Sequence, residues 1–566
     1  MIVYFKKLLK ILEKKERYYF LTVIFLAFVS AILEMIGIAL IIPAVILLLE
    51  SQVSENINFI GYNIYDLVLY LKSFNPLIPL SFIVFGFLLK NIFLFLISWF
   101  NAGVINKIGL RISRDILKNY FKKDYSFFLD NSVSKLTFNN TEVVYRFNET
   151  LGFIFLFLSE LLVLITIATF MILIEPKGFF IGLSFILIAS FFVLIIVRNK
   201  TTRYGSEIKK IDQQRFQQLS NSFGAIKEIK VLNKFFFFID DYFNTTKKMV
   251  NKQISLSAIN AIPRFFIESL FVITIVIFIF YLNFLEIPSG KIILILSISG
   301  VAALRLMPCF SRVLNSLQRI KYGYVYIDTI SDIFNQKLSS ERNNENISQS
   351  KQKKIYFENI DYKFNDRSEE ILKNINITIN EFDFIGLIGK TGSGKSTFAN
   401  LILKLLNPSK GKIINNFEKI SFVPQSPYLI NGSIKDNIAF GLKKDEINDQ
   451  LIKKCLVDSQ LEDFIGSLNK GIETRIGDRG LAISGGELQR IAIARSLYTK
   501  PDLIIFDEAT NALDKNTEEK IIKLIHNLSK KITIILITHD IKNISYCSKI
   551  YKINEKKIEL IDKKIN

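Results

Sequence analysis

Apolar runs of about 20 residues recur through the first half of the chain, and no other feature of the sequence restricts the fold as strongly. A helix needs a run of this length to cross the hydrocarbon core of a bilayer. The sequence predicts six such helices, over Tyr18–Leu49, Leu77–Val104, Leu151–Ile174, Phe179–Val197, Phe265–Phe284 and a run from Ile292 past Arg305. Half of the residues are hydrophobic and the mean hydropathy is +0.31, which argues against an ordinary soluble enzyme. The first run is too long for a signal peptide, and no small-residue cleavage site follows it.

The placement of Lys and Arg predicts how these helices are oriented. Six cations precede the first run: Lys6, Lys7, Lys10, Lys14, Lys15 and Arg17. Long basic segments follow the second and fourth runs, at residues 107–148 and 198–264, whereas the segments after the other runs are short or poor in cations. Because cations are enriched in cytoplasmic loops, we expect a cytoplasmic N-terminus. Six crossings then return the second half of the chain to the cytoplasm.

The long basic segments are predicted to be helical extensions rather than soluble domains. Ile108–Tyr120 keeps apolar residues at helical spacing, so we expect the second to fifth membrane helices to continue well beyond the bilayer. Interruptions at Tyr125–Ser132 and Asn221–Asn233 each predict a small transverse helix. On the opposite side, Ser54–Phe74 is either an amphipathic helix lying on the outer face or a plain loop with buried aromatic residues.

A second domain follows a change in composition after Gln336. Residues 336–354 are polar and predict a linker between a membrane domain at 1–335 and a domain at 355–566. In the second domain, an apolar strand at Phe382–Ile388 leads into GKTGSGKS at Gly389–Ser396, and an apolar helix is expected at Phe398–Leu406. This spacing matches GxxxxGK[ST], a loop whose backbone N–H groups wrap phosphate oxygens. We expect Lys395 to reach the β- and γ-phosphates of ATP and the Ser396 hydroxyl to bind Mg²⁺.

Two adjacent carboxylates end another apolar strand, predicted at Leu503–Phe506. Carboxylates at a strand end have distinct roles in a phosphate site. Asp507 is expected to hold Mg²⁺, and Glu508 is expected to polarise the attacking water. Together with the phosphate loop, this pair predicts ATP hydrolysis.

The segment ISGGELQR at Ile483–Arg490 resembles the signature of the ABC transporter ATPase family. Further segments resemble the family's motifs in the expected order: Phe364 the adenine-stacking aromatic, Val423–Gln425 the Q-loop, Thr474–Gly480 the segment before the signature, Asn511–Asp514 the D-loop and Thr538–His539 the switch histidine. The resemblance covers the whole chain. It implies a polytopic α-helical membrane domain of exporter type, with six spans, followed by an α/β P-loop ATPase domain.

The resemblance also implies a set of site residues. Glu508, His539 and Gln425 would act in hydrolysis, and Mg²⁺ would be held by Ser396, Gln425 and Asp507. ATP would be contacted by Phe364, Gly389, Thr391, Gly392, Ser393, Gly394, Lys395, Ser396, Thr397, Ser484, Gly485 and Gly486. Ile483 and Glu487 stand where the family has Leu and Gln. Gly411–Phe422 is shorter than usual, and we expect a trimmed β-hairpin there.

A single copy of this chain lacks the parts of a complete ATP site as the family builds it. In the family, ATP lies between the phosphate loop of one domain and the signature of another, and this chain has one of each. The resemblance therefore implies a second copy and a two-fold symmetric homodimer. The two small transverse helices would carry the motion of the ATPase domains to the membrane helices.

Four cations near or within the predicted membrane helices bear on the cargo: Lys90, Arg264, Arg305 and Arg312. An Arg at membrane depth is costly unless it faces a cavity or a partner, and its guanidinium suits bidentate contact with phosphate. One interpretation is a basic stripe along an inward-facing cavity. The other is anchoring at the cytoplasmic surface, or pairing with Glu34, Glu160 or Glu268.

Short segments near these cations resemble one branch of the family, the bacterial lipid-linked oligosaccharide flippases of protein glycosylation. The segments are LEMIGIALIIP at Leu33–Pro43, IPRFFIE at residues 262–268 and LRLMP at residues 304–308. The resemblance implies a polyprenyl-pyrophosphate-linked glycan as cargo, bound through Arg264, Arg305 and Arg312. It also implies a place in the bacterial inner membrane, with both termini and the ATPase domain in the cytoplasm.

Two rival functions remain. One is export of another amphiphile, such as a lipid A type lipid, a drug or a peptide. The other is a membrane-bound ATP-binding regulator or channel, against which Glu508 and His539 both argue. The net charge of +20 suits an anionic membrane surface, and six membrane helices exclude a cytosolic nucleic-acid ATPase. Three Cys and two His predict neither a disulfide scaffold nor a zinc or haem site.

Overall fold

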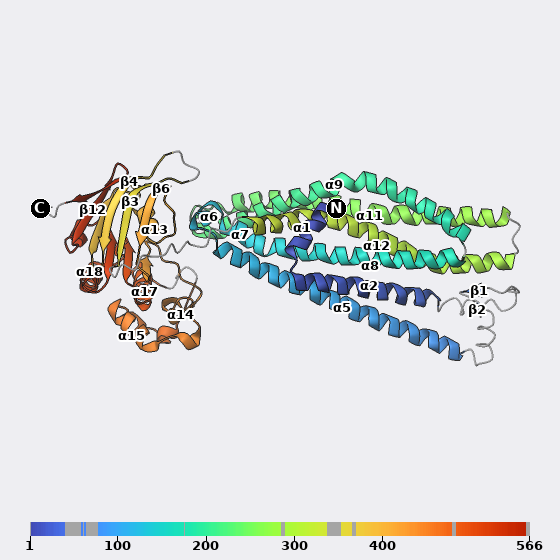
Figure 1. Cartoon of the computed structure of the whole chain (residues 1–566), viewed down its shortest axis with the longest axis horizontal. Coiled ribbons are helices and arrows are strands. Elements are labelled where there is room, and N and C mark those ends of the chain that lie inside the picture. The colour runs from blue at the N-terminus through green and yellow to red at the C-terminus, as the bar shows by residue number, and fades with distance from the viewer. Residues whose placement is uncertain are drawn as a thin grey trace. The chain divides into compact units, whose positions relative to one another are not determined.

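The structure, a computed structural model, describes residues 2–39, 58–59, 62–63, 77–174, 176–284, 289–336, 353–364, 369–477 and 483–561 (Figure 1). The chain divides into two units. Unit 1 comprises Met1–Lys123 and Phe128–Ser340, and unit 2 comprises Asp124–Phe127 and Glu341–Asn566. Each unit is described by itself.

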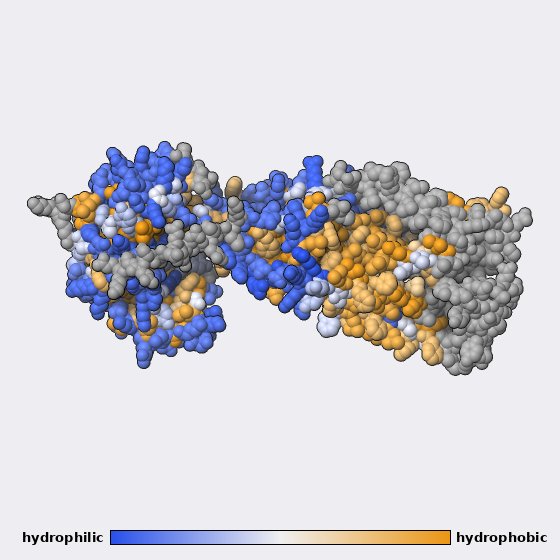
Figure 2. Space-filling view, in the orientation of Figure 1, coloured by the Kyte–Doolittle hydropathy of each residue, from blue (hydrophilic) through white to orange (hydrophobic). Residues whose placement is uncertain are grey.

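Unit 1 is built from long helices. Six of them coincide with the six predicted membrane helices: α2 (Lys14–Ala39), α5 (Leu77–Phe121), α8 (Glu142–Ile174), α9 (Pro176–Gly224), α11 (Phe235–Phe284) and α12 (Ser289–Asn335). A further helix, α1 (Ile2–Ile11), precedes them. Among the described residues, four stretches are long and apolar enough to cross a membrane: Lys14–Gly37, Ser81–Phe121, Val133–Phe170 and Phe235–Phe280. Figure 2 shows apolar side chains spread over the surface of this unit, beside a hydrophilic part of the same unit.

The long helices exceed the thickness of a bilayer. The 45 residues of α5 extend for roughly 68 Å at 1.5 Å per residue, about twice the hydrocarbon core. Short helices separate the long helices along the chain: α6 (Tyr125–Asp130) and α7 (Val133–Asn140) follow α5, and α10 (Ile226–Val231) lies between α9 and α11. The predicted extensions and the two small helices are therefore confirmed.

Close helix packing in unit 1 depends on a glycine. A Cβ on Gly323 of α12 would lie 2.5 Å from Cγ2 and 2.7 Å from Cβ of Thr150 in α8, well inside van der Waals contact. The backbone of α12 approaches α8 at this level because Gly323 has no side chain. Thr150 itself is buried, and its hydroxyl donates to the Arg146 carbonyl oxygen of its own helix.

The outer segment differs from the predicted amphipathic helix where it is described. Asn58–Phe59 (β1) and Tyr62–Asn63 (β2) form a short antiparallel pair, so a continuous helix over Ser54–Phe74 is wrong at these positions. The rest of that segment, the end of the first predicted span after Ala39, and most of the linker at 336–354 lie outside the described residues.

Unit 2 contains a six-stranded sheet in the order β13-β12-β5-β11-β10-β7. The strands are β5 (Phe384–Gly389), β7 (Ile420–Val423), β10 (Leu503–Asp507), β11 (Thr533–Ile537), β12 (Lys549–Asn554) and β13 (Lys557–Ile561). All neighbours are parallel except β12 and β13. Because β5, β10 and β11 are parallel, their carboxyl ends meet at one edge of the sheet, where the P-loop and the carboxylate pair begin.

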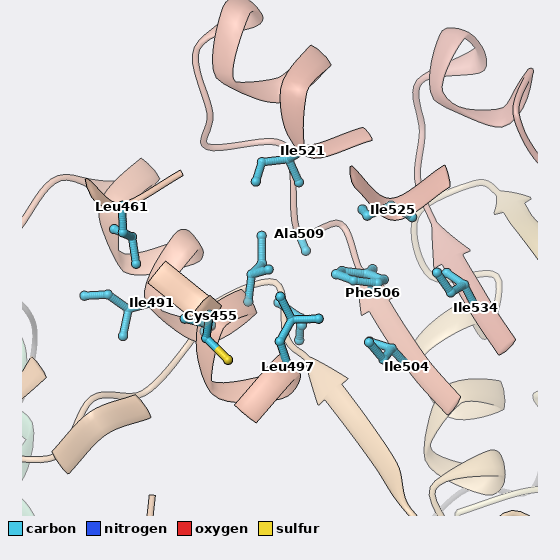
Figure 3. Close-up of a cluster of buried hydrophobic side chains, with 14 of the residues drawn as sticks. Cys455, Leu461, Ile491, Leu497, Ile504, Phe506, Ala509, Ile521, Ile525 and Ile534 are labelled. Carbon is cyan, nitrogen blue, oxygen red and sulfur yellow. The ribbon is translucent and has the colours of Figure 1, made fainter. Parts of the chain in front are cut away.

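A second sheet and several helices complete unit 2. The sheet is antiparallel in the order β4-β3-β6, with β3 at Lys354–Tyr362, β4 at Leu372–Asn380 and β6 at Lys410–Asn415. Two further strands, β8 (Gly432–Ser433) and β9 (Arg475–Ile476), form a separate pair. The helices are α13 (Lys395–Ile402), α14 (Ile434–Ile438), α15 (Asp449–Asp458), α16 (Glu462–Gly466), α17 (Gly485–Tyr498), α18 (Lys515–Ser529) and α19 (Ile541–Ile544). Figure 3 shows the core in which Phe506 and Ile534 of the sheet face Ile521 and Ile525 of α18.

The trimmed β-hairpin expected at Gly411–Phe422 is wrong. Strand β6 pairs with β3, whereas β7 belongs to the other sheet and pairs with β10. The buried Asn415 side chain explains the separation, because its amide donates to the Ile402 carbonyl (2.9 Å) and accepts from the Phe417 N–H (3.0 Å). These bonds turn the chain out of the first sheet and bury Phe417 before β7 begins.

Candidate functional site

The loop at Gly389–Ser396 curves around the start of α13. Gly392 and Gly394 have φ values of 80° and 106°, which glycine adopts without steric cost. Lys395 is buried, and its Nζ donates to the carbonyl oxygens of Gly389 (2.8 Å) and Lys390 (3.2 Å). The helix begins at Lys395, three residues before the predicted Phe398, because Gly394 serves as its N-cap. Thr391 and Thr397 belong to the same loop and first helical turn.

A hydroxyl and a carboxylate meet beside this loop. The Ser396 hydroxyl donates to Oδ2 of Asp507 over 3.3 Å. Burial raises the pKa of the Asp507 carboxyl above its usual range, and the neighbouring charge of Glu508 adds to the increase. The Ser396 hydrogen bond and the Lys395 cation act in the opposite direction. A bound cation would stabilise the ionised form of Asp507.

Glu508 is the centre of a hydrogen-bonded cluster. Its Oε1 lies 2.6 Å from Nε2 of His539, and its Oε2 accepts from the side-chain amides of Gln425 (2.7 Å) and Asn511 (3.2 Å). A carboxylate only accepts hydrogen bonds, so Nε2 of His539 carries the proton in this arrangement. Nζ of Lys395 lies 3.5 Å from the same nitrogen. Glu508 has a φ of 51°, a left-handed conformation that is uncommon for Glu and occurs at functional sites.

The loop and the carboxylates fit a nucleotide with Mg²⁺. In the part of the chain that the structure describes, Lys395 forms no ion pair with a carboxylate, and the buried Ser393 hydroxyl has no hydrogen-bond partner. An anionic phosphate would satisfy both groups. No group of three or more His, Cys, Asp or Glu side chains able to hold a metal occurs among the described residues. Mg²⁺ is usually bound by one or two carboxylates together with substrate phosphates, and Asp507 beside the Ser396 hydroxyl would supply the carboxylate. The side-chain amide of Gln425, the third predicted ligand, donates to Glu508.

The signature segment forms the start of α17. Ser484 is the N-cap, its hydroxyl accepts from the Glu487 N–H (3.3 Å), and its own N–H donates to Glu487 Oε2 (2.8 Å). Glu487, which departs from the family pattern, therefore completes a capping box. Ile483, the other departure, packs against the hydrophobic core. Gly485 and Gly486 lie against Ala512 of the D-loop segment.

The structure does not join the signature to the P-loop cluster within one chain. Among the described residues, no hydrogen bond or ion pair links Ser484–Gly486 to Lys395, Asp507 or Glu508. The aromatic residue predicted to stack on adenine, Phe364, packs edge-on against Tyr362 with ring centroids 5.2 Å apart. Residues 478–480 of the segment before the signature lie outside the described residues.

Two side chains near the site belong to recognised motifs, the D-loop and the signature segment, but are not among the predicted site residues. The side-chain amide of Asn511 donates to Glu508, which lies three positions earlier in the chain. A partner at so short a spacing can be found by inspecting neighbouring residues in the sequence. The buried Gln489 of α17 donates to the Pro424 carbonyl oxygen (3.1 Å), next to Gln425. These partners are 65 positions apart, and no local signal links them.

The membrane cations are paired where their side chains are described. Nζ of Lys90 lies 3.1 Å from Oε2 of Glu34, and Nε of Arg264 lies 2.9 Å from Oε1 of Glu268. Arg312 forms a bidentate pair with Glu160, at 2.7 and 3.0 Å. Pairing, the alternative to a bare basic stripe, is thus observed for these three. The Arg305 side chain lies outside the described residues.

Comparison with known proteins places the chain in a family. Residues 20–302, half of the chain, match the ABC transporter transmembrane region, and residues 372–511 match the ABC transporter domain. An export ATP-binding/permease protein of Rickettsia typhi is 36% identical over 217 residues, which cover 36% of this chain and 37% of that protein. The ATP-dependent lipid A-core flippase of Wigglesworthia glossinidia brevipalpis is 28% identical over 515 residues, covering 83% of this chain and 84% of the flippase.

A solved structure shares the fold of the whole chain. The structure of a bacterial Atm1-family ABC exporter with ATP bound matches with a TM-score of 0.79 and 18% identity, over 96% of this chain and 94% of the other. The predicted fold class, a polytopic helical membrane domain followed by an α/β P-loop domain, is confirmed. The chain is a multi-pass membrane protein and belongs to the ABC transporter family.

Proposed function

We propose that this protein is an ATP-driven exporter that moves a lipid-type amphiphile across the membrane. The observation that carries the proposal is the cluster around Glu508, in which a carboxylate beside a P-loop is held by His539 and Gln425. A regulator or channel without turnover has no need of this arrangement. The membrane-spanning helices on the same chain supply the structure to which hydrolysis is coupled.

Each residue of the cluster has a distinct role in the proposal. Bound ATP and Mg²⁺ supply the phosphoryl group and the neutralising charge. Lys395 and the backbone of Gly389, Gly392 and Gly394 bind phosphate oxygens, with Thr391, Ser393 and Thr397 beside them, and Phe364 packs on the base. Glu508 orients and polarises the attacking water, and His539 stabilises the charge that develops. Ser396, Asp507 and Gln425 hold the metal ion.

A homodimer completes the site in this proposal. Among the described residues, no hydrogen bond or ion pair joins Ser484, Gly485 and Gly486 to the cluster of their own chain, which leaves them available to a second copy. A two-fold arrangement gives two equivalent sites. We propose that α6 and α10 transmit the movement of the ATPase units to the membrane helices. The protein would lie in the bacterial inner membrane, with both termini and the ATPase unit in the cytoplasm.

The cargo proposed first is a lipid with an acidic headgroup. The support is the likeness to a lipid A-core flippase over more than four fifths of both chains. A polyprenyl-pyrophosphate-linked oligosaccharide is the second candidate, supported by the short segments around Arg264 and Arg305 and by the phosphate chemistry of Arg312. The carboxylate partners of Arg264 and Arg312 weaken that second candidate, because their charges are already compensated.

The test is transport by purified protein in proteoliposomes. Lipid A, a polyprenyl-pyrophosphate-linked glycan and phosphatidylcholine are each incorporated, and their movement between leaflets is measured with and without ATP and Mg²⁺. ATP-dependent movement of lipid A that is lost in Glu508→Gln supports the proposal. Movement of the glycan alone would select the second candidate, and ATP turnover without movement of any lipid would contradict both.

A further inference from the structure

A cavity of about 680 Å³ lies between α11 and α12 in unit 1. Asn260 and Arg264 line it from α11, and Arg312, Asn315 and Arg319 line it from α12. The volume falls in the range of pockets that hold small molecules or the headgroup of a larger one. The side chains on its wall therefore indicate which chemistry it accepts.

Two of the three arginines in the cavity are already neutralised. Arg264 is paired with Glu268, and both oxygens of Glu160 accept from Arg312. Arg319 differs from both. Among the described residues it forms no ion pair, and its buried Nε has no hydrogen-bond partner. Arg319 is thus the cation in this cavity whose charge the described residues leave uncompensated.

The Arg319 side chain is nevertheless fixed in direction. Its guanidinium carbon lies 5.6 Å from the centroid of the Phe153 ring on α8, within the range of a cation–π contact. This contact accounts for one face of the guanidinium but supplies no acceptor for its N–H groups. A buried N–H donor without an acceptor costs about 1–3 kcal/mol, so an acceptor from a ligand is favoured.

Asn260 has an unsatisfied hydrogen-bond acceptor in the same cavity. Its Oδ1 is buried and has no hydrogen-bond donor among the described residues. A ligand that satisfies both side chains must carry an anionic acceptor for Arg319 and a hydroxyl or N–H donor for Asn260. A phosphate ester of a sugar or polyol has both groups within one headgroup.

We propose that Arg319 and Asn260 form the binding site for a hydroxyl-bearing phosphate headgroup in this cavity. The inference deepens the proposed function, on which it rests for the assumption that an amphiphile enters the cavity. Arg319 donates charge-assisted hydrogen bonds to the phosphate, and Asn260 accepts from a hydroxyl of the same headgroup. The paired Arg264 and Arg312 border the site without supplying its net positive charge.

Equilibrium binding without ATP tests the site. Purified full-length protein in detergent is titrated with lipid A, with soluble glucose 1-phosphate and with phosphatidylcholine, at low and high salt. We expect Arg319→Gln to weaken lipid A binding about tenfold or more, as the loss of a charged hydrogen bond does. Arg319→Lys keeps the charge and should show an intermediate loss. Asn260→Leu should weaken ligands with a headgroup hydroxyl.

Arg203→Gln is the matched control, because Arg203 is exposed in the same unit and outside the cavity, and it should bind like wild type. Thermal unfolding verifies that each variant is folded. Binding of lipid A alone identifies a lipid-borne headgroup, and binding of glucose 1-phosphate identifies a soluble ligand; both support the site if Arg319→Gln removes them. Binding that ignores Arg319 but disappears when Arg264 is replaced would overturn it. Because this assay needs no hydrolysis, its result is independent of whether the transport assay succeeds.

Discussion

Gln489, buried in the signature helix α17, donates its amide to the carbonyl oxygen of Pro424, the residue before Gln425. The segment that carries the amide partner of Glu508 is thereby tied to the helix that starts with the signature. In the proposed two-fold dimer these two elements would serve different ATP sites. The bond would then connect the two sites within a single chain.

Gln489→Leu is expected to lower turnover more than ATP binding. The substitution leaves the Pro424 carbonyl without its donor, at a cost of roughly 1–3 kcal/mol, while the P-loop is untouched. We expect kcat to fall by about tenfold, which corresponds to roughly 1.4 kcal/mol, with little change in the Kd for ATP. Gln450→Leu, at an exposed position on α15, is the control. An equal loss of ATP affinity would indicate general damage instead of a positioning role.

Glu508→Gln is expected to abolish ATP turnover while ATP binding survives. The amide keeps the shape of the carboxylate but cannot polarise water, and Lys395, Ser396 and Asp507 are unchanged. Turnover and nucleotide affinity are measured on the same purified sample. Glu519→Gln, exposed on α18, should behave like wild type. Turnover near the wild-type rate in Glu508→Gln would reject Glu508 as the residue that activates water.

Asp507→Asn is expected to abolish ATP hydrolysis without lowering the melting temperature of the protein. Because the folded-state pKa of Asp507 is raised, the folded protein binds its proton more tightly than the unfolded chain does. Stability from this group is therefore present below the unfolded pKa and is lost as pH rises through the folded pKa. At neutral pH without nucleotide, Asn should leave the melting temperature unchanged or higher, while Mg²⁺-dependent hydrolysis disappears. A lower melting temperature without nucleotide would show that the ionised carboxylate stabilises the fold.

Glu487→Ala and Glu487→Gln should differ. Both Glu and Gln complete a capping box, but Ala leaves the Ser484 N–H without its acceptor. We expect Ala to destabilise the start of α17 by about 0.5–2 kcal/mol, the usual cost of a lost cap, and Gln to be close to neutral. Thermal unfolding together with ATPase rates measures both effects. If Gln were as damaging as Ala, the carboxylate charge rather than the cap would be the important feature.

Gly323→Ala is expected to destabilise unit 1. The new methyl group would overlap the Thr150 side chain, and overpacking of this kind costs about 1–3 kcal/mol. Gly103→Ala on α5 is the matched control, because a Cβ there meets nothing within 4 Å. Thermal unfolding in detergent compares the two. Equal melting temperatures would show that α8 and α12 separate readily at this level.

Features with local causes were predictable from the sequence. The P-loop, the strand that ends in Asp507 and the six apolar helices each depend on consecutive residues. The pair of Arg264 and Glu268 is visible as an i, i+4 spacing on one helix. The ion pair of Arg312 with Glu160 has no such local signal, because Glu160 is 152 positions away. Only the packing of α8 against α12 brings the two residues close.

The features that the sequence did not predict correctly depend on contacts between distant parts of the chain. The expected hairpin at Gly411–Phe422 looked local, yet both of its strands pair with distant segments, and a buried Asn415 sends the chain from one sheet to the other. Arg319 is not distinguished in the sequence, because its distinctive feature is that it forms no ion pair with any described residue.

The capping box at the start of α17 determines what Ser484 still has to offer. One lone pair of its oxygen is occupied by the Glu487 N–H, which leaves the hydroxyl proton free to be directed outward. Beside it, the positive end of the helix dipole points the same way. The start of α17 therefore favours a ligand surface made of hydrogen-bond acceptors, such as phosphate oxygens. It disfavours a surface that presents donors or positive charge.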